Sequence, residues 1–439
     1  MFVRRPLLVA VAALGVLVTS ASAARANGRF PASSAVVFSP SDDAQIMVRT
    51  TFGLLVTRDR GASWGWICER AIGFSGPEDP SYVVTKSGAI VAGLFDGLRV
   101  SRDGGCSWSA VKTDATVFVD VTSRADGAVV ALASSYDRHS DAGSLYKTQL
   151  WISTDDARSF AALGPRFDPA LLGETVEVAP GDPSRLYVSA VRGEGTGRMG
   201  VVLASADGGR TWSERRSMLL GAELAPFIAA VDAKRPDRVY VRTSAPPDSP
   251  TRLLVSDDAA KTFRTLLVAK GPLLGFALSP DGARVSAGGP DDGLYAGSAE
   301  GPELAQVSGP KLRVQCLGQS GDVLWACASE ASGFIAGTSR SGGASFEARL
   351  HLRDIAGPIA CAEGSAVAKE CASDWLKLRG ELGAGDPGTD AGARRSGADG
   401  GRVVPGEAVR TRDDGVLWAA IVAALGAGAL LLRARSRKK

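Results

Sequence analysis

Five aspartates that could take part in acid–base chemistry recur along the chain at nearly even spacing: Asp59, Asp103, Asp155, Asp207 and Asp258. Paired carboxylates carry out the proton-transfer and nucleophilic steps of glycoside hydrolysis, provided that they face each other across a cleft. Each of these five, however, occupies the third position of a recurring octapeptide. The first question is therefore whether the repeat needs the carboxylate for its own structure.

The octapeptide follows the pattern hydroxyl-x-Asp-x-Gly-x-Ser/Thr-aromatic. Clear copies are TRDRGASW (57–64), SRDGGCSW (101–108) and SADGGRTW (205–212), and weaker copies are STDDARSF (153–160), SDDAAKTF (256–263) and SRSGGASF (339–346). Their starts are separated by 44, 52, 52, 51 and 83 residues. The last interval has room for one further unit without the motif, at residues 293–304. Such a period indicates a repeat architecture.

The pattern suits a β-turn. The hydroxyl and the carboxylate accept backbone N–H bonds and close the loop, glycine supplies a positive φ, and the aromatic residue restarts a strand. Where Ala157 or Ala260 replaces the glycine we expect strain, and where Ser341 replaces the aspartate we expect weaker closure. We interpret the five aspartates as structural.

Each turn lies late in a unit of four short strands, which is the composition of a propeller blade. The fourth unit contains TVEVA, the turn GDPS, RLYVSAV and the strands around the octapeptide. The units run over 36–72, 80–113, 117–165, 174–219, 226–269, 274–308 and 312–353. The sequence thus predicts an all-β, seven-bladed β-propeller over residues 30–353, with six or eight blades as alternatives.

These octapeptides resemble Asp-boxes, the bacterial-neuraminidase repeats of sialidases, sortilin-like receptors, xyloglucan-type glycosidases and photosystem II assembly factors. The resemblance covers about 290 residues and implies the propeller fold, which hosts many functions. A sialidase would need an arginine triad, a tyrosine–glutamate pair and an early Arg-Ile-Pro motif, where this chain offers only Gly28-Arg29-Phe30-Pro31. We assign no catalytic residue.

Long connections between the second and third strands indicate where a ligand could bind, because in propellers that resemble this one ligands sit on the face opposite the boxes. We expect such loops at Ser134–Thr148, Arg192–Gly200 and Ser244–Thr251. Long loops are often functional. Aromatic residues with arginines could bind an acidic glycan or a protein segment. The candidate ligand residues are Tyr136, Arg138, His139, Tyr146, Arg192, Arg198 and Arg252.

The sequence lacks the residues that histidine-based catalysis, metal binding and nucleic-acid binding would need. The only histidines are His139 and His351, neither near a nucleophile-elbow motif, so neither a Ser-His-Asp site nor a histidine-based metal site is expected. We expect no cofactor and no metal. Seven of the 50 basic residues lie in the terminal segments 1–24 and 433–439, which leaves 43 against 47 acidic residues. The body therefore has no basic surplus for nucleic acid.

The two ends indicate export and anchoring. Residues 1–26 combine Arg4-Arg5, an apolar run and small residues, as in a secretory signal peptide. Residues 415–433 contain an uncharged apolar run, and five basic residues follow by the end of the chain, which predicts a transmembrane helix with a cytoplasmic tail at 434–439. These features resemble myxobacterial sorting tails, which carry a cysteine just before the helix, although here no cysteine lies beyond Cys371. Residues 380–414 read as a flexible linker.

Six cysteines in an exported chain predict disulfides: Cys68, Cys106, Cys316, Cys327, Cys361 and Cys371. Fifteen pairings are possible. Closeness in sequence favours Cys316–Cys327 and Cys361–Cys371, which leaves Cys68–Cys106. Residues 354–379 would then form a disulfide loop and a short capping helix.

Together these features predict an exported, membrane-anchored propeller, acting as a binding or scaffolding module at the cell envelope. We expect the propeller on the periplasmic or extracellular side. Its partner would be a glycan or an envelope protein, and the chain would act as a monomer. The alternative is a sialidase-like glycoside hydrolase.

Overall fold

The computed structural model describes residues 31–383 except 77, 142 and 218. The predicted signal peptide, the transmembrane helix 415–433, the tail 434–439 and nearly all of the linker lie outside the described residues. Among the residues described, no helix is long and apolar enough to cross a membrane.

Twenty-eight of the described strands form seven antiparallel units of four, each in chain order. Blade 1 contains β1 (Ser33–Phe38), β2 (Ile46–Thr50), β3 (Gly53–Thr57) and β4 (Trp64–Ile67). Blade 2 contains β5 (Ser81–Val84), β6 (Ile90–Leu94), β7 (Gly97–Ser101) and β8 (Ser109–Val111). Blade 3 contains β9 (Phe118–Ser123), β10 (Val129–Ser140), β11 (Gly143–Ser153) and β12 (Ala161–Leu163). Blade 4 contains β13 (Leu171–Val178), β14 (Leu186–Arg192), β15 (Met199–Ser205) and β16 (Ser213–Ser217).

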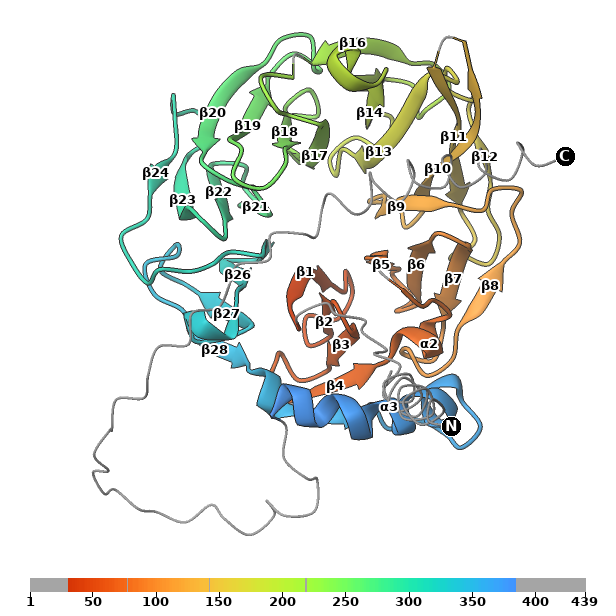
Figure 1. Cartoon of the computed structure of the whole chain (residues 1–439), viewed down its shortest axis with the longest axis vertical. Helices are drawn as coiled ribbons and strands as arrows, with labels where there is room; N and C mark the ends of the chain where they lie inside the picture. The colour runs from red at the N-terminus through yellow and green to blue at the C-terminus, as the bar shows by residue number, and fades with distance from the viewer. Residues whose placement is uncertain (1–30, 77, 142, 218, 384–439) are drawn as a thin grey trace, which may run out of the picture. The chain divides into compact units, whose positions relative to one another are not determined.

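Blade 5 contains β17 (Ala225–Val231), β18 (Val239–Ser244), β19 (Thr251–Ser256) and β20 (Arg264–Ala269). Blade 6 contains β21 (Gly275–Leu278), β22 (Arg284–Gly289), β23 (Gly293–Ser298) and β24 (Ala305–Gln306), and blade 7 contains β25 (Cys316–Ser320), β26 (Val323–Cys327), β27 (Ala336–Ser339) and β28 (Glu347–Leu350). Figure 1 shows the sheets around a common axis with the first strands innermost. The seven-bladed propeller is confirmed.

The hydrophobic core lies between neighbouring blades. One cluster joins Val130 and Leu132 of β10 to Leu186 and Val188 of β14, and similar clusters fill other blade interfaces. The middle strands are covered on both faces, which explains why β14 is a nearly continuous apolar run, LYVSAVR. Burial of apolar side chains between neighbouring sheets therefore holds the blades in a ring, and the turns determine where the strands end.

The octapeptide turns join the third and fourth strands, and we call them box turns. In the blade 3 turn Ser153 Oγ donates to Asp155 Oδ1 at 2.8 Å, and Ser159 donates its backbone N–H to Oδ1 at 2.9 Å and its hydroxyl to Oδ2 at 2.6 Å. The N–H of Ala157 donates to Ser153 Oγ at 2.9 Å. Every acceptor atom of the pattern is thus used inside the turn.

The other boxes repeat this geometry. Hydrogen bonds from Ser63 and Thr211 hold the pKa values of Asp59 and Asp207 at about 2. Ala157 and Ala260 take the left-handed φ values of 58° and 65° that glycine would adopt freely. In the last copy Ser341 accepts the N–H of Ser345 at 3.0 Å in place of a carboxylate.

The disulfides correct two of the three expected pairs. Cys316–Cys327 links register partners on β25 and β26, as predicted, but Cys68 pairs with Cys371 and Cys106 with Cys361. The prediction from closeness in sequence was wrong because the closed ring brings the segment after blade 7 next to the first two blades. Three disulfides indicate an oxidising, exported compartment.

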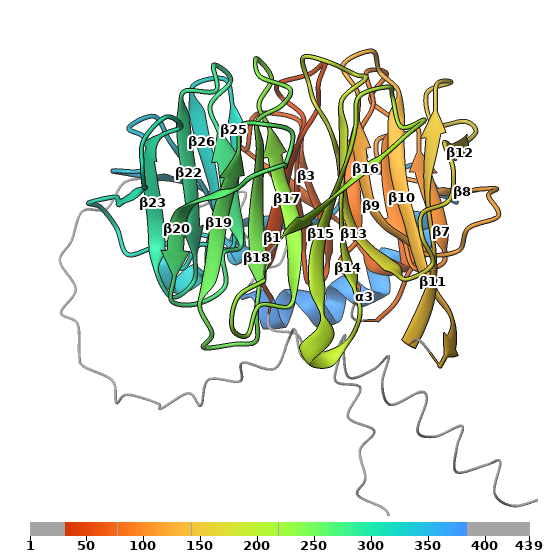
Figure 2. The same cartoon turned by 90° about the horizontal axis from the view of Figure 1, so that it is seen from above.

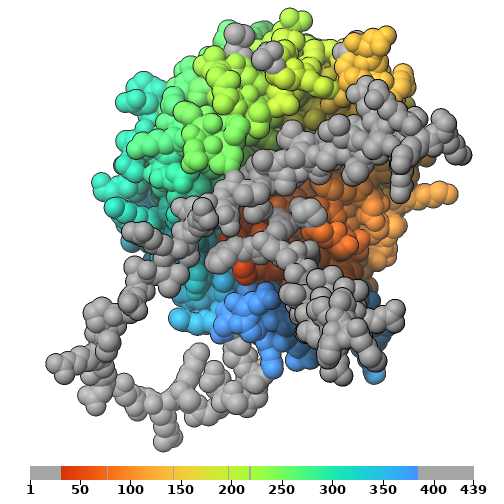
Figure 3. Space-filling view, viewed as in Figure 1, coloured from red at the N-terminus to blue at the C-terminus, as the bar shows by residue number. Residues whose placement is uncertain are grey.

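The residues after blade 7 form a strap, residues 352–382, that covers the first two blades. It comprises η3 (Leu352–Asp354), β29 (Ile355–Pro358), which pairs in parallel with β4, and α3 (Ala366–Leu382). Ser365 caps α3 by accepting the N–H of Ala368. Figure 3 shows the blue strap against the red and orange residues of the first blades.

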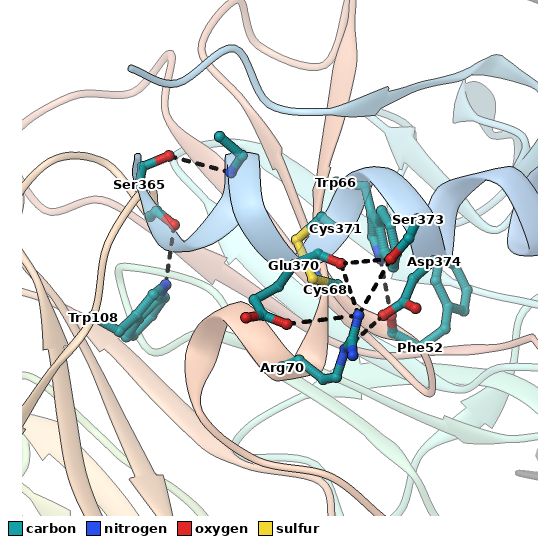
Figure 4. Close-up of a disulfide and its surroundings, with 12 residues drawn as sticks. Phe52, Trp66, Cys68, Arg70, Trp108, Ser365, Glu370, Cys371, Ser373 and Asp374 are labelled. Atoms are coloured by element: carbon teal, nitrogen blue, oxygen red, sulfur yellow. Dashed lines mark hydrogen bonds and ion pairs between the residues drawn. A yellow bond between two sulfur atoms is a disulfide. The ribbon is translucent and has the colours of Figure 1, made fainter. Parts of the chain in front are cut away.

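Side-chain packing as well as the Cys68–Cys371 disulfide holds the strap to blade 1. The ring centroids of Trp375 of α3 and Trp66 of β4 lie 5.6 Å apart, and α3 contacts α2 (Glu69–Ile72). Arg70 donates from Nε to the carboxylate of Asp374 at 3.0 Å beside the Cys68–Cys371 bond (Figure 4). The strap therefore spans the seam where blade 7 meets blade 1.

Candidate functional site

The connections between second and third strands, and those between blades, share one face of the ring, opposite the box turns. We call it the long-loop face. The loop expected at Ser134–Thr148 is instead a continuation of β10 and β11 as a hairpin whose last register pair is Ser140 and Gly143. Figure 2 shows the ends of these strands projecting from the ring. The side chains of this hairpin alternate between its two faces, because the backbone hydrogen bonds between β10 and β11 fix their register.

Two tyrosines face each other on this hairpin. Tyr136 and Tyr146 are register partners, and their rings meet edge to face with centroids 6.3 Å apart. Tyr136 is 52% exposed, whereas burial raises the pKa of Tyr146. An exposed ring supported by a second one is a rigid apolar contact surface.

The connection of blade 4 meets the same hairpin. It contains η1 (Gly195–Gly197), and Glu194 before it accepts the N–H of Ser144 at 3.1 Å. Hydrogen bonding by Ser144 lowers the pKa of Glu194, and the charges of His139 and Arg198 act in the same direction. Tyr136, His139, Tyr146 and Arg198 are therefore brought together, and we call them with Glu194 the tyrosine cluster.

The three other predicted ligand residues are engaged by nearby carboxylates. Arg138 pairs with Asp137 at 2.8 Å. Arg192 donates to Asp168 at 2.9 Å and to Glu214 at 2.8 Å. Arg252 forms a bidentate pair with buried Glu223, at 2.7 and 2.6 Å. Arg192 and Arg252 thus stabilise connections of blades 4 and 5 rather than joining the tyrosine cluster.

The innermost strands carry three carboxyl groups that sequence reasoning did not single out. Asp120 of β9 accepts from Ser81 Oγ at 2.8 Å and from the N–H of Val176 at 2.9 Å, which ties blade 3 to both neighbours. Glu177 of β13 accepts from Thr122 Oγ1 at 3.0 Å. Charged residues on the first strand of a blade are a usable signal once the strand is known to be innermost.

Burial changes the charge state of these groups. It raises the pKa of Asp120 to about 6 and that of Glu177 to about 8, the latter also because of the neighbouring Asp120 charge. Burial likewise raises the pKa of Glu174 to about 8, with a partly compensating effect of Arg198. The first strands of the blades surround the axis of the ring, and we call the space between them the channel. At pH 7 its wall therefore holds an ionised Asp120 beside a protonated Glu177.

Two shallow hollows lie elsewhere, beside the box turns of blades 2 and 3, with volumes of about 510 and 370 Å³. Their lining includes Arg102 and Asp156, which pair with each other at 2.9 Å. Within the described part of the chain, no group of three or more His, Cys, Asp or Glu side chains could hold a metal ion.

Comparison with known proteins gives the fold. No family model matches the chain, and no curated protein sequence is similar to it. An ancestral glycoside hydrolase family 74 enzyme superimposes with a TM-score of 0.53 at 15% identity, over 72% of this chain and 46% of that one. The chain thus spans less than half the length of that enzyme.

Two further structures are similar. Hydrazine synthase of Kuenenia stuttgartiensis gives a TM-score of 0.52 at 11% identity, over 73% of this chain and 99% of that one. A protein of unknown function from Dyadobacter fermentans gives 0.42 at 16% identity, over 62% and 92%. At these identities the first two show the propeller fold and nothing finer.

Proposed function

We propose that this chain is an Asp-box propeller exported to the cell envelope and anchored in a membrane by residues 415–433, where it binds a protein partner through its long-loop face. The observation that carries this proposal is the placement of exposed apolar side chains. Phe95, Tyr136, Met199 and Leu220 are 37–52% exposed, and all four lie in connections or at strand ends of the long-loop face in blades 2 to 4.

The composition of this face favours a protein over a bare glycan. Aromatic residues, methionine and arginine are enriched in protein interfaces, and this face presents Tyr136, Met199 and Arg198. The β10–β11 hairpin projects from the ring on this face (Figure 2), so a partner of the face would contact it. Arg198 and Glu194 supply polar groups of both signs beside the apolar contacts.

Site-specific photo-cross-linking in cells tests this proposal. A photoreactive residue at position 136 should give a discrete protein adduct, whereas the same residue at position 340 should not. Arg340 is a control on the opposite face, because its side chain is 71% exposed in the box turn of blade 7. Identical adduct patterns at both positions, or adducts to glycan alone from position 136, would contradict a protein-binding long-loop face.

A second function is favoured by the channel carboxyls. An ionised Asp120 beside a protonated Glu177 is the charge state that glycosidases use for base and acid. A glycosidase of family 74 also shares the fold. Against this role, Asp120 already accepts hydrogen bonds from Ser81 and from the N–H groups of Val121 and Val176.

Hydrolysis of fluorogenic glycosides by the full chain decides this alternative. If the pair is catalytic, E177Q and D120N each abolish turnover, while D207N, in a box turn, retains it. Turnover that survives both channel substitutions would exclude these carboxyls as the catalytic pair.

A further inference from the structure

The two disulfides that hold the strap join cysteines that are far apart in the chain. Their sequence separations are 303 residues for Cys68–Cys371 and 255 residues for Cys106–Cys361, so each forms only after blade 7 has reached blade 1. Cys68 and Cys106, in contrast, are 38 residues apart. Because the probability of closing a flexible loop falls roughly as the 3/2 power of its length, the unfolded chain brings Cys68 and Cys106 together about 20-fold more often than either native pair.

Folding of the first two blades strengthens this preference. The box turn of blade 2 packs against the last strand of blade 1, since a side chain on Gly105 would collide with Cδ1 of the buried Ile67. Gly105 directly precedes Cys106, and Ile67 directly precedes Cys68. This contact involves no residue beyond blade 2. The packing of the first two blades therefore brings the two thiols close to each other before the strap arrives.

The strap cysteines show the same bias toward each other. Cys361 and Cys371 are 10 residues apart, on either side of the N-terminus of α3. Cys316 and Cys327 are register partners in blade 7, so for them the nearest thiol is also the native partner. A chain that is oxidised before its ring closes thus forms one native bond and two wrong ones.

Such a chain contains no thiol that could correct the pairing. The sequence has six cysteines, all of them paired in the native structure, and the mispaired chain uses all six as well. Disulfide exchange begins with attack by a thiolate, so the thiolate has to come from another molecule. The attack also has to precede docking of the strap, because Cys68 and Cys371 are only 2% and 0% exposed in the native fold.

We propose that this chain is a substrate of a dithiol disulfide isomerase in the compartment where it folds. The isomerase thiolate attacks Sγ of Cys106 in the wrong Cys68–Cys106 bond and forms a mixed disulfide, which releases the Cys68 thiolate. That thiolate attacks Sγ of Cys371 in the wrong Cys361–Cys371 bond, which forms the native Cys68–Cys371 bond and releases the Cys361 thiolate. The Cys361 thiolate attacks Sγ of Cys106 in the mixed disulfide, which forms the native Cys106–Cys361 bond and restores the isomerase thiolate. Two disulfides enter and two leave, so no oxidant or reductant is consumed.

The native fold is the end point of this exchange. Docking of the strap packs Trp375 against Trp66 and buries the Cys68–Cys371 bond, which removes that bond from further attack. Cys106 and Cys361 stay half-buried, so the last exchange step remains accessible while the strap docks. This dependence on an isomerase goes beyond the proposed function and does not involve the long-loop face.

Refolding of the oxidised full chain in mild detergent tests the proposal. The chain is oxidised in denaturant, the denaturant is removed, and a catalytic amount of protein disulfide isomerase is added in its dithiol form. Mass spectrometry of non-reduced peptides, after free thiols are blocked, reports the pairs. We expect Cys68–Cys106 in the oxidised chain, and we expect Cys68–Cys371 to form at least tenfold faster with the dithiol isomerase than with its disulfide form or with no enzyme. Absence of the Cys68–Cys106 pair, or equal rates in the three samples, would overturn the proposal.

A measurement in cells separates exchange from folding. In cells that lack the disulfide isomerase of the exporting compartment, the share of the full chain that carries Cys68–Cys106 should rise at least tenfold. The control C106A/C361A lacks the competing thiols, so it should form Cys68–Cys371 equally well with and without the isomerase. Loss of the parent chain alone from the isomerase-deficient cells would also support the proposal. Equal pairing of the parent in both kinds of cell, or equal loss of the parent and C106A/C361A, would contradict it.

Discussion

The strap that closes the ring makes a quantitative prediction for the double substitution C68A/C371A. The two disulfides that hold the strap are nested, with sequence separations of 303 and 255 residues that differ by 48. While Cys106–Cys361 stays intact, Cys68–Cys371 therefore closes an effective loop of about 48 residues. Chain-entropy scaling gives this loop about 4 kcal/mol of stabilisation.

Removing both strap disulfides releases a far larger loop. The same scaling gives about 10 kcal/mol for the fourfold variant C68A/C106A/C361A/C371A. The matched control C316A/C327A opens an 11-residue separation within blade 7, for which the scaling gives about 3 kcal/mol. With an unfolding entropy of about 2.1 cal/mol/K per residue, these values correspond to melting-temperature losses of about 5, 13 and 4 °C.

Differential scanning calorimetry of the purified full chain measures the three losses. The decisive comparison is the fourfold variant against the control pair, because only the former lets the ends of the chain separate. If the fourfold variant loses no more than the control, the strap does not close the ring, and packing between β1 and β25 alone must hold the seam.

Other substitutions test the turns and the channel. A157G should raise the free energy of unfolding by about 1 kcal/mol, because glycine takes the left-handed φ without strain, and unchanged calorimetry would refute the strain. At pH 7 the melting temperature of D207N should be lower than that of the parent. This difference should disappear as pH falls from about 4 through about 2, because the lowered pKa of Asp207 stabilises the fold only while the carboxyl is ionised. The stability of the parent should fall as pH rises from about 4.5 to 8, because the raised pKa of Glu177 makes the folded state bind more protons than the unfolded state. E177Q should remove this fall. A parent whose melting temperature is flat over that range would contradict the prediction.

The fold was predictable because its signal is local. Each box turn is completed within eight residues, so Asp59 or Asp207 can be interpreted without knowledge of the rest of the chain. Counting the four-strand units around these turns gave the order of the blades and seven as their number. The disulfides were not predictable in this way, because Cys68 and Cys371 meet only after the ring has closed.

The candidate site was predictable in part. Tyr136 and Tyr146 were named as candidate ligand residues, and the structure places them face to face, but their segment was interpreted as a loop because its Ser, Asp and Gly residues hide the alternation of a hairpin. Glu174 and Glu177 read as ordinary solvent-facing positions of an alternating strand. Only the placement of β13 at the centre of the ring turns that exposed face into a channel wall and raises the pKa of both groups.

The central claim is that the box aspartates stabilise the turns while the opposite face binds the partner. The affinity of the partner captured at position 136, measured for R198Q and D207N at a temperature where both are folded, tests this claim most directly. We predict that R198Q loses at least tenfold in affinity and that D207N binds as the parent does. Loss of binding in D207N with binding intact in R198Q would contradict the claim.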